Sequence, residues 1–465
     1  PFDIGEGWAM EPWNQEEMPV SEELTRQAAE QSDLALVVLG RTAGEDKDNS
    51  AAEGSYLLTA AEEEILRNVC NAFARTIVVL NVGNIMDMKW VDRYQPQAVL
   101  YVWQGGQEGG RATVDVLTGK VNPGGKLSDT IAEDIEDYPS TENFGDPVEN
   151  FYTEDIYVGY RYYETRYIGD DNVYTPEEEA EYQKAVQYPF GYGLSYTTFT
   201  QELQGVTFDD TAHTAAVQVK VTNTGAVTGK EVVQVYGQSP YTEYDKEHLI
   251  EKAAVQLMGF EKTAELAPGA SETVTVQVPM QWLASFDTKG YGTYIMEAGN
   301  YYFAVGSSAH DAVNNILAAK GANVNGSAAL TYTWNQAETD ASTYAKSLYT
   351  GESITASFPD ADINYWLEEA DRITYLSRQD WQGTWPETIQ LTAGDKLKAA
   401  LNDKKKYENG KYNDTASRIQ VYDVKTGDGS TILSAAMMRG RPYNDEYWNT
   451  LLDNLTVEDI VALVA

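Results

Sequence analysis

Residues 34–66 decide the fold, and they begin with the apolar run Leu-Ala-Leu-Val-Val-Leu-Gly at residues 34–40. A short unbroken apolar run is typical of a strand that is covered on both faces. Residues 56–66 place apolar side chains on one side and acidic ones on the other, which predicts a helix. The polar loop between them, residues 41–48, then lies at the carboxyl end of the strand, where open α/β sheets place their ligands. Glu45 in this loop is therefore a candidate catalytic residue.

Strand and helix patterns alternate along the first part of the chain. Apolar runs recur at residues 76–82 and 98–103, and a helix pattern at residues 111–117 follows the second of these runs. An alternation of this kind predicts an α/β domain whose mainly parallel sheet is sandwiched by helices. We expect this domain to span residues 1–200.

The hydrophobic period changes beyond that domain. Valines alternate with polar residues at 215–221 and again at 274–278, and residues 301–305 show another short strand pattern. Strict alternation is typical of strands with one buried face. The sequence therefore predicts an all-β sandwich of the immunoglobulin or fibronectin III type over residues 201–306.

The rest of the chain carries weaker patterns. Residues 307–440 are expected to be a mixed linker or decoration region, because they begin with small polar residues and offer one clear helix candidate, the basic segment 396–407. Residues 441–465 contain two apolar helix patterns, 445–455 and 457–464, which need a packing partner. Together with the length of 465 residues, these changes suggest roughly two to four domains.

Composition excludes several classes of partner. The chain contains 72 Asp and Glu against 33 Lys and Arg, which gives a formal net charge of −39. A field of this sign repels phosphate backbones and anionic membranes, so neither nucleic acid nor a membrane is an expected partner. No window approaches the ~18 consecutive apolar residues of a membrane-spanning helix. The chain opens at Pro1 without a charged leader and apolar core, so a signal peptide is either absent or already removed. We expect a bacterial protein, cytoplasmic rather than secreted.

The content of metal-binding residues is low. Cys70 is the only cysteine, so no disulfide can form within the chain. The three histidines are scattered, and one cysteine cannot complete a Cys/His zinc site with them. We therefore expect no metal and no cofactor.

Three segments imitate catalytic motifs without meeting their requirements. Residues 119–126 resemble a phosphate loop, but the glycine spacing is wrong and Leu127 replaces the hydroxyl that would bind magnesium. Ser195 lacks the second glycine of a nucleophile elbow. Glu108 is a rival carboxylate in a glycine-rich turn, where we expect it to bind local backbone amides. We interpret residues 189–199, around Ser195, as a rigid connector between domains.

Several segments, in family order, resemble glycoside hydrolase family 3, the β-glucosidase family. Those in the α/β domain are residues 78–81, 103–110, 115–119, 122–127, 156–163 and 189–199. Those in the predicted sandwich, which resembles the family's fibronectin type III-like domain, are residues 221–225, 231–236, 257–261 and 266–269. The resemblance covers about residues 20–306 and implies a glycosidase.

The resemblance implies a role for the loop at residues 41–48. Family members with this domain take their general acid/base from the Glu of an Arg-x-x-Gly-Glu motif, which here ends at Glu45. Arg41, Asp46 and Asp48 are the residues expected to bind substrate or to position Glu45. Three interpretations of Arg41 stay open: it positions Glu45, it binds a sugar hydroxyl, or it forms an ion pair at the surface.

The chemical partner of Glu45 is absent from this sequence. In the family, an Asp nucleophile comes from a Ser/Thr-Asp-Trp motif in a separate (β/α)8 barrel, and residues 1–465 contain no such barrel. Gln379-Asp380-Trp381 is a superficial match, because no barrel strand precedes it. Some bacterial members resemble a permuted order of sheet domain, sandwich and barrel, and residues 441–465 look like the start of that barrel. The expected partner is therefore a second chain or fragment that carries the barrel and its nucleophile Asp.

Three functions fit this resemblance. The first is an exo-acting retaining β-glucosidase, to which this chain supplies the acid/base while the barrel is supplied separately. The second is a β-xylosidase or related exo-glycosidase of the same family, since the missing barrel residues that contact the sugar decide specificity. The third is a non-catalytic carbohydrate-binding or scaffold fragment. The expected substrate is a β-glucoside or oligosaccharide, and assembly into a homo-oligomer is left open.

Overall fold

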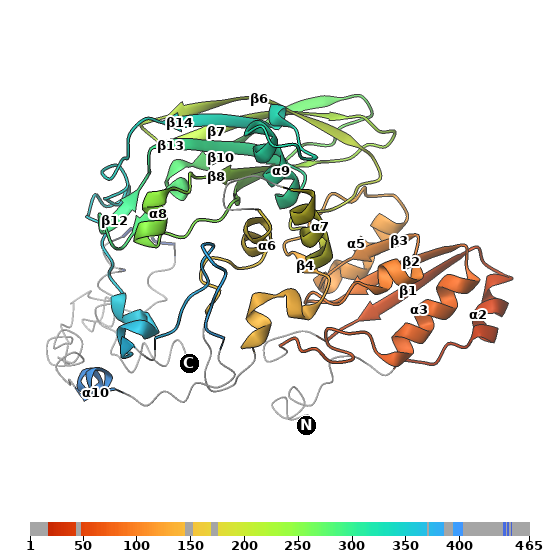
Figure 1. Ribbon diagram of the computed structural model, residues 1–465. Coiled ribbons are helices and arrows are strands. Elements are labelled where there is room, and N and C mark those ends of the chain that lie inside the picture. The colour runs from red at the N-terminus through yellow and green to blue at the C-terminus, as the bar shows by residue number, and fades with distance from the viewer. Residues whose placement is uncertain are drawn as a thin grey trace, which may run out of the picture. The chain divides into compact units, whose positions relative to one another are not determined.

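The computed structural model describes residues 17–42, 48–144, 152–168, 175–369, 372–385, 394–402, 440–442, 444, 445 and 448. The chain divides into two compact units. The first comprises Pro1–Pro359 and Ile373–Ile389, and the second comprises Asp360–Arg372 and Gln390–Ala465. Within the first unit, an α/β part precedes a β-sandwich along the chain (Figure 1).

The α/β part is built on a parallel sheet with the strand order β1-β2-β3 (Figure 1). Its helices and strands are α2 (Glu22–Ala29), β1 (Leu34–Gly40), α3 (Ala60–Ala72), β2 (Arg75–Asn81), α4 (Trp90–Tyr94), β3 (Ala98–Tyr101), α5 (Gly109–Leu117), β4 (Ile131–Ala132), α6 (Tyr160–Arg166), α7 (Pro176–Ala185) and β5 (Val186–Tyr188). The three apolar runs expected to be strands all form this sheet, and β1 pairs with β2 over its full length. The predicted parallel sheet is confirmed.

Local sequence determines where the helices beside the sheet begin. The side chain of Ser21 caps α2 at its N-terminus. Thr59 and Glu62 form a reciprocal capping box at the start of α3. The apolar side of α3 then packs against one face of the sheet, where Leu66 and Leu39 are buried in a common core.

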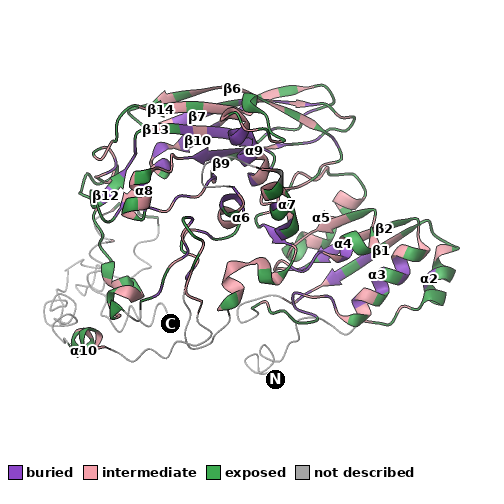
Figure 2. Ribbon diagram, viewed as in Figure 1, coloured by how far each residue is buried: buried purple, intermediate pink, exposed green. Residues whose placement is uncertain are grey.

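The opposite face of β1 is open, so the expectation of a strand covered on both faces is wrong. Leu34, Leu36 and Val38 are 43%, 49% and 55% exposed, whereas Val37 and Leu39 are buried. α5 lies on this side of the sheet, but a groove of about 510 Å³ lies between it and β1. Within the described part of the chain no helix fills this groove, and burial along β1 alternates as in a strand with one covered face (Figure 2).

The sandwich consists of two antiparallel sheets, with the strand orders β10-β7-β6 and β14-β13-β8-β9. Its helices and strands are β6 (Phe199–Asp209), β7 (Thr214–Asn223), β8 (Val232–Gln238), α8 (Glu243–His248), β9 (Gln256–Lys262), β10 (Ser271–Pro279), β11 (Ser285–Asp287), β12 (Thr293–Ile295), β13 (Gly299–Gly306), α9 (Ala309–Ala319) and β14 (Thr331–Gln336). The valines of β7 and β10 occupy alternate, buried positions and meet the side chains of β8 and β13 in one core (Figure 2). The predicted fibronectin-like sandwich is confirmed.

Part of the expected linker, residues 307–440, belongs to the sandwich. β14 pairs with β13, and α9 packs on the same strand through a core that includes Val313, Ile316 and Leu317. These apolar residues stand three and four apart, and Ser308 caps the helix. They are ordinary helix signals that the small and polar composition of the segment concealed.

The connector between the two parts, residues 189–199, packs closely against both of them, as predicted. A Cβ atom on Gly193 would lie 2.3 Å from the backbone oxygen of Gly125, and one on Gly191 would lie 2.2 Å from the side chain of Gln234. Glycine is required at both positions because no side chain fits there.

A later segment, residues 373–385, returns to the first unit. The backbone N–H of Leu376 donates to the carbonyl oxygen of Thr153 at 2.8 Å, and the hydroxyl group of Thr153 donates to the carbonyl oxygen of Thr384 at 2.8 Å. The ring of Trp381 packs edge-on against Tyr157, with centroids 5.0 Å apart. We call residues 373–385 the return segment.

In the second unit, the structure describes the α-helix α10 (Asp395–Asn402). It agrees with the basic helix predicted at residues 396–407 as far as the described residues extend. Lys396 covers Tyr365, with its Nζ atom 3.2 Å from the ring centroid. The helices expected at residues 445–455 and 457–464 lie almost wholly outside the described residues.

Candidate functional site

The loops best placed for chemistry lie at the carboxyl edge of the three-stranded sheet. The chain leaves β1 into Arg41, leaves β2 into the segment that contains Asp87, and leaves β3 into Trp103. Because the strands are parallel, their carboxyl ends share one edge, and open α/β sheets bind ligands there.

Arg41 is buried at this edge, and the protein engages all five of its N–H donors. Two of them form a bidentate ion pair with Glu62 of α3, at 2.5 and 2.9 Å. The other three donate to the backbone oxygens of Gly40, Ser55 and Leu57, at 2.9, 3.0 and 3.3 Å. Arg41 is therefore not a surface ion pair, and a sugar hydroxyl could bind its guanidinium only by displacing one of these partners.

Glu62 ties the same arrangement to the helix. Its side chain is fully buried, and its Oε2 atom also accepts the backbone N–H of Thr59 at 2.8 Å. One carboxylate thus caps α3 and pairs with Arg41. The end of β1 and the first turn of α3 are held together as a result.

A second set of hydrogen bonds holds the far end of the loop. The side-chain amide of Asn49 donates to the carbonyl oxygen of Ile85 at 2.9 Å, and the backbone N–H of Ser50 donates to the hydroxyl oxygen of Ser55 at 3.1 Å. Because the carbonyl oxygen of Ser55 also accepts from Arg41, both ends of the loop converge on the same short segment. Both ends of the loop are therefore fastened by hydrogen bonds to neighbouring segments of the α/β part.

The structure places the predicted site residues unevenly. Glu45 and Asp46 lie outside the described residues, Arg41 is buried and Asp48 is exposed. The structure brings Arg41 to Glu62, which the sequence does not single out because 21 residues separate the two.

A group of charged side chains near this edge is missed by the sequence reasoning. Asp87 is 8% exposed, and burial raises the pKa of its carboxyl group. The Nζ atom of Lys89 lies 3.8 Å from Asp87 and also bonds to Asp134. Groups with displaced pKa values gather at functional sites. Its position in the sequence could have identified Asp87 as a candidate, because Asp87 follows β2 much as residues 41–48 follow β1.

Trp103 is the second residue that the sequence reasoning misses. Its φ angle of 52° lies in the left-handed region, which a bulky residue rarely adopts. Its ring lies 4.3 Å from that of Tyr101, measured between centroids. Strained residues cluster at binding sites, which makes Trp103 a candidate for contact with a ligand at this edge. A backbone angle leaves no trace in a single sequence.

Glu108 is exposed. Its side chain is 78% exposed, lies 3.8 Å from Arg111 and makes no capping hydrogen bond at the start of α5. The expectation that Glu108 binds local backbone amides is therefore wrong.

Asp380 occupies a turn of the return segment. Its Oδ1 atom accepts the backbone N–H of Gln382 at 2.9 Å, while the adjacent Trp381 packs against Tyr162 with ring centroids 5.7 Å apart. Both residues thus have structural roles within the described part of the chain.

The phosphate-loop-like segment and Ser195 both fasten the connector. The Nζ atom of Lys126 donates to the carbonyl oxygen of Gly193 at 2.8 Å and lies 3.2 Å from Glu231. The hydroxyl group of Ser195 donates to the side chain of Asn122 at 2.8 Å. These contacts agree with the prediction of a turn and a rigid connector.

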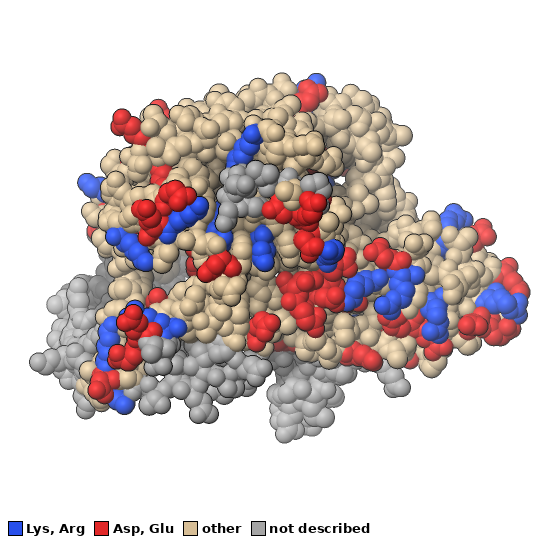
Figure 3. Space-filling view, viewed as in Figure 1, with Lys and Arg blue, Asp and Glu red and all other residues tan. Residues whose placement is uncertain are grey.

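Among the described residues, no three His, Cys, Asp or Glu side chains converge to hold a metal ion. The helices of this part of the chain are too short or too polar to cross a bilayer. Acidic side chains are spread over the face shown in Figure 3, interleaved with lysines and arginines.

Both parts of the first unit match known protein domains. Residues 16–160 match the glycosyl hydrolase family 3 C-terminal domain, and residues 231–309 match the fibronectin type III-like domain. Beta-glucosidase of Ruminococcus albus is 47% identical over 316 residues, which are 67% of this chain and 31% of that protein. Beta-glucosidase A of Butyrivibrio fibrisolvens is 38% identical over 335 residues, which are 63% of this chain and 38% of that protein. The chain thus spans about a third of the length of these relatives.

A solved structure shares the fold. The beta-glucosidase from Paenibacillus barengoltzii superposes with a TM-score of 0.60 at 42% sequence identity, over 73% of this chain and 34% of that one. The α/β part and the sandwich follow one another here in the order of the two matched domains. By its sequence and by its fold, the chain belongs to glycosyl hydrolase family 3.

Proposed function

We propose that this chain supplies the general acid/base, Glu45, to an exo-acting retaining β-glucosidase. The relatives named above are beta-glucosidases, and we infer that the remaining catalytic machinery lies outside residues 1–465. The observation that carries the proposal is the anchored loop, which leaves the carboxyl end of β1 and is fastened at Arg41 and Asn49. A loop held at both ends can present a carboxyl group with the precision that proton transfer needs.

The mechanism needs two carboxyl groups about 5 to 5.5 Å apart. An Asp on a (β/α)8 barrel, carried by a second chain or fragment, attacks the anomeric carbon while Glu45 gives its proton to the leaving oxygen. Deprotonated Glu45 then takes a proton from the water that hydrolyses the glycosyl-enzyme. Cover by the barrel and the nearby carboxylate of the nucleophile raise the pKa of Glu45, so that it can donate near neutral pH.

The surroundings of Arg41 suit such a proton donor. A free guanidinium beside a carboxyl group lowers that group's pKa, which would weaken an acid catalyst. The charge of Arg41 is paired with Glu62 and its donors are all engaged, so it offers no counter-ion to Glu45. We therefore assign loop positioning to Arg41, and positioning of the substrate to Asp46 and Asp48.

Reconstitution tests the proposal. The 465-residue chain is assayed on an aryl β-glucoside, alone and after mixing with a separately expressed family 3 barrel. We propose that residues 441–465 correspond to the start of such a barrel. Activity that needs the mixture, and that falls by about 100-fold or more with Glu45→Gln, supports it. Activity of the chain alone contradicts the split of the catalytic pair. Glu64→Gln, at an exposed glutamate of α3, is the matched control and should leave the rate unchanged.

A further inference from the structure

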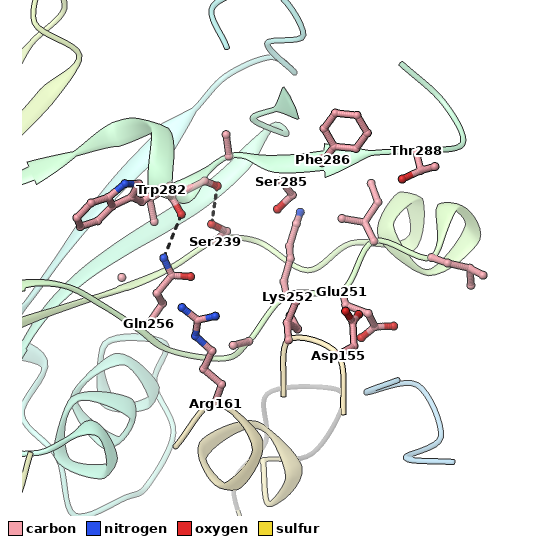
Figure 4. Close-up of a pocket in the computed structure, with 17 residues that line it drawn as sticks. Asp155, Arg161, Ser239, Glu251, Lys252, Gln256, Trp282, Ser285, Phe286 and Thr288 are labelled. Carbon is pink, nitrogen blue, oxygen red and sulfur yellow. Dashed lines mark hydrogen bonds between the residues drawn. The ribbon is translucent and has the colours of Figure 1, made fainter. Parts of the chain in front are cut away.

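A cavity of about 370 Å³ lies in the first unit, between the segment that begins α6 and one end of the sandwich (Figure 4). Its walls come from residues 155–161, from the segment 249–256 and from the turn at residues 282–288. Its volume is within the ~300–1,000 Å³ of small-molecule sites. None of its lining residues belongs to the loops that follow β1, β2 or β3, so it is separate from the carboxyl edge of the sheet.

Arg161 brings a positive charge to this cavity. The side chain is half-buried, and in Figure 4 it points into the cavity toward Gln256. Among the described residues, its guanidinium has no hydrogen-bond or ion-pair partner. A planar guanidinium in this state matches a carboxylate, which it can bind through two parallel hydrogen bonds.

Glu251, on the same wall, is already fully engaged. It accepts hydrogen bonds from the hydroxyl groups of Tyr157 and Ser377, at 2.5 and 2.6 Å, and from the backbone N–H of Arg378 at 3.1 Å. The last two donors belong to the return segment, which is thereby fixed behind the wall. These neutral donors hold the carboxylate of Glu251, and the structure shows no ion pair between Glu251 and Arg161.

The other charged side chains of the wall are also paired. Lys252 forms buried ion pairs with Asp245 and Glu297. Asp155 interacts with another residue of the chain. Of the two cationic side chains on the wall, Lys252 is thus paired, and Arg161 is the one without an ion-pair partner among the described residues.

Neutral groups complete the lining. The hydroxyl group of Ser239 donates to the carbonyl oxygen of Leu283 at 2.9 Å and keeps its oxygen lone pairs for another donor (Figure 4). The amide nitrogen of Gln256 donates to the carbonyl oxygen of Trp282 at 3.4 Å, which leaves the amide oxygen for a ligand. The hydroxyl group of Ser285 also lines the cavity, and the side chain of Trp282 is 48% exposed at its rim.

We propose that this cavity binds a saccharide that carries a carboxylate, such as a uronic acid residue. The carboxylate pairs with Arg161, the sugar hydroxyls exchange hydrogen bonds with Ser239, Ser285 and Gln256, and the indole of Trp282 covers an apolar face of the ring. The site is a second saccharide site on the chain, and it does not depend on Glu45.

Calorimetric titration of the 465-residue chain tests this site. The probes are a glucuronic acid–glucose disaccharide and cellobiose, its neutral counterpart. We expect the acidic disaccharide to bind at least about tenfold more tightly than cellobiose, because a hydrogen bond between charged groups is stronger than one to a neutral hydroxyl. Arg161→Gln should abolish that difference, and Trp282→Ala should weaken both sugars.

The controls separate this site from folding and from catalysis. Arg67→Gln removes an exposed arginine that lies 3.9 Å from Glu64, and it should bind like the wild type. Glu45→Gln should also bind like the wild type, so that a failure here is independent of the proposed catalytic role. Thermal melting checks that each variant is folded. Equal affinity for the two sugars, unchanged binding by Arg161→Gln, or no binding of the acidic disaccharide would overturn the proposal.

Discussion

Arg41 and Glu62 form a bidentate ion pair in which the two side chains are only 1% and 0% exposed. The pair joins the residue that follows β1 to the first turn of α3, and it therefore fixes the point at which the candidate catalytic loop begins. Both the stability of this edge and the proposed chemistry depend on it.

Replacing Arg41 with Met is expected to lower the free energy of unfolding by about 3–5 kcal/mol, because Glu62 then keeps a buried charge without its partner. Glu62→Gln alone should also destabilise the fold, while the double variant should recover much of the loss. Urea unfolding of the four proteins gives the coupling energy. Strictly additive single effects would show that the two side chains do not act as a pair.

The stability of the chain should fall as the pH rises above neutrality, because of His310. This residue lies 2.9 Å from Glu164 and 3.3 Å from Glu179. Burial lowers the pKa of His310, but the two carboxylates outweigh burial and raise it to about 9. In the unfolded chain the pKa is about 6.5, so the stabilisation is complete below that pH and is lost as the pH rises to about 9.

The check is thermal unfolding of the wild type and of His310→Gln between about pH 6 and pH 9.5, a window of about 3.5 units that contains both pKa values. The wild type should lose stability across the window, and the variant should lose clearly less. Parallel curves would exclude His310 as the titrating group.

Gly193→Ala should destabilise the connector between the α/β part and the sandwich. A Cβ atom at this position meets the backbone oxygen of Gly125 at 2.3 Å, and a backbone atom cannot move aside without disturbing its own segment. Gly125→Ala is the matched control, because a Cβ atom there has nothing within 4 Å. Chemical unfolding should show a loss of about 1–3 kcal/mol for the first variant and little for the second. Similar losses would contradict the close approach.

Two leucines of β1 should respond very differently to truncation. Leu39 is 1% exposed in the core with α3, whereas Leu36 is 49% exposed on the open face. Leu39→Ala is expected to cost about 2–5 kcal/mol, and Leu36→Ala less than about 1 kcal/mol. Equal costs in urea unfolding would mean that the outer face of β1 is covered after all.

Strand existence was predictable, but strand exposure was not. The apolar runs at β1, β2 and β3 predict strands because a parallel strand buries side chains in both directions. Whether both faces are in fact covered depends on which elements lie over them. Nothing within residues 34–40 reveals that α5 stands away from Leu36 and Val38.

Of the candidate site, the sequence predicts the strand that leads into the loop but not the contacts that hold the ends of the loop. The loop after β1 could be identified from the strand that precedes it. The partner of Arg41 could not, because 72 acidic residues offer many candidates and Glu62 is reached only when α3 folds back along the sheet. The strained backbone of Trp103 and the buried position of Asp87 likewise follow from tertiary packing. The helix α9 could have been predicted, because its apolar residues are spaced as in a helix. It was missed because the small and polar composition of residues 307–328 suggested a linker.

Chemical rescue at Glu45, in the chain mixed with a family 3 barrel, tests the proposed acid/base role most directly. Glu45→Gly is assayed on a β-glucoside with a leaving group that needs no protonation, with and without azide. We predict slow turnover that azide accelerates, with formation of the β-glucosyl azide, because the small anion replaces the water that the variant can no longer activate. Turnover of Glu45→Gly at the wild-type rate, with no effect of azide, would contradict the assignment of this residue as the acid/base.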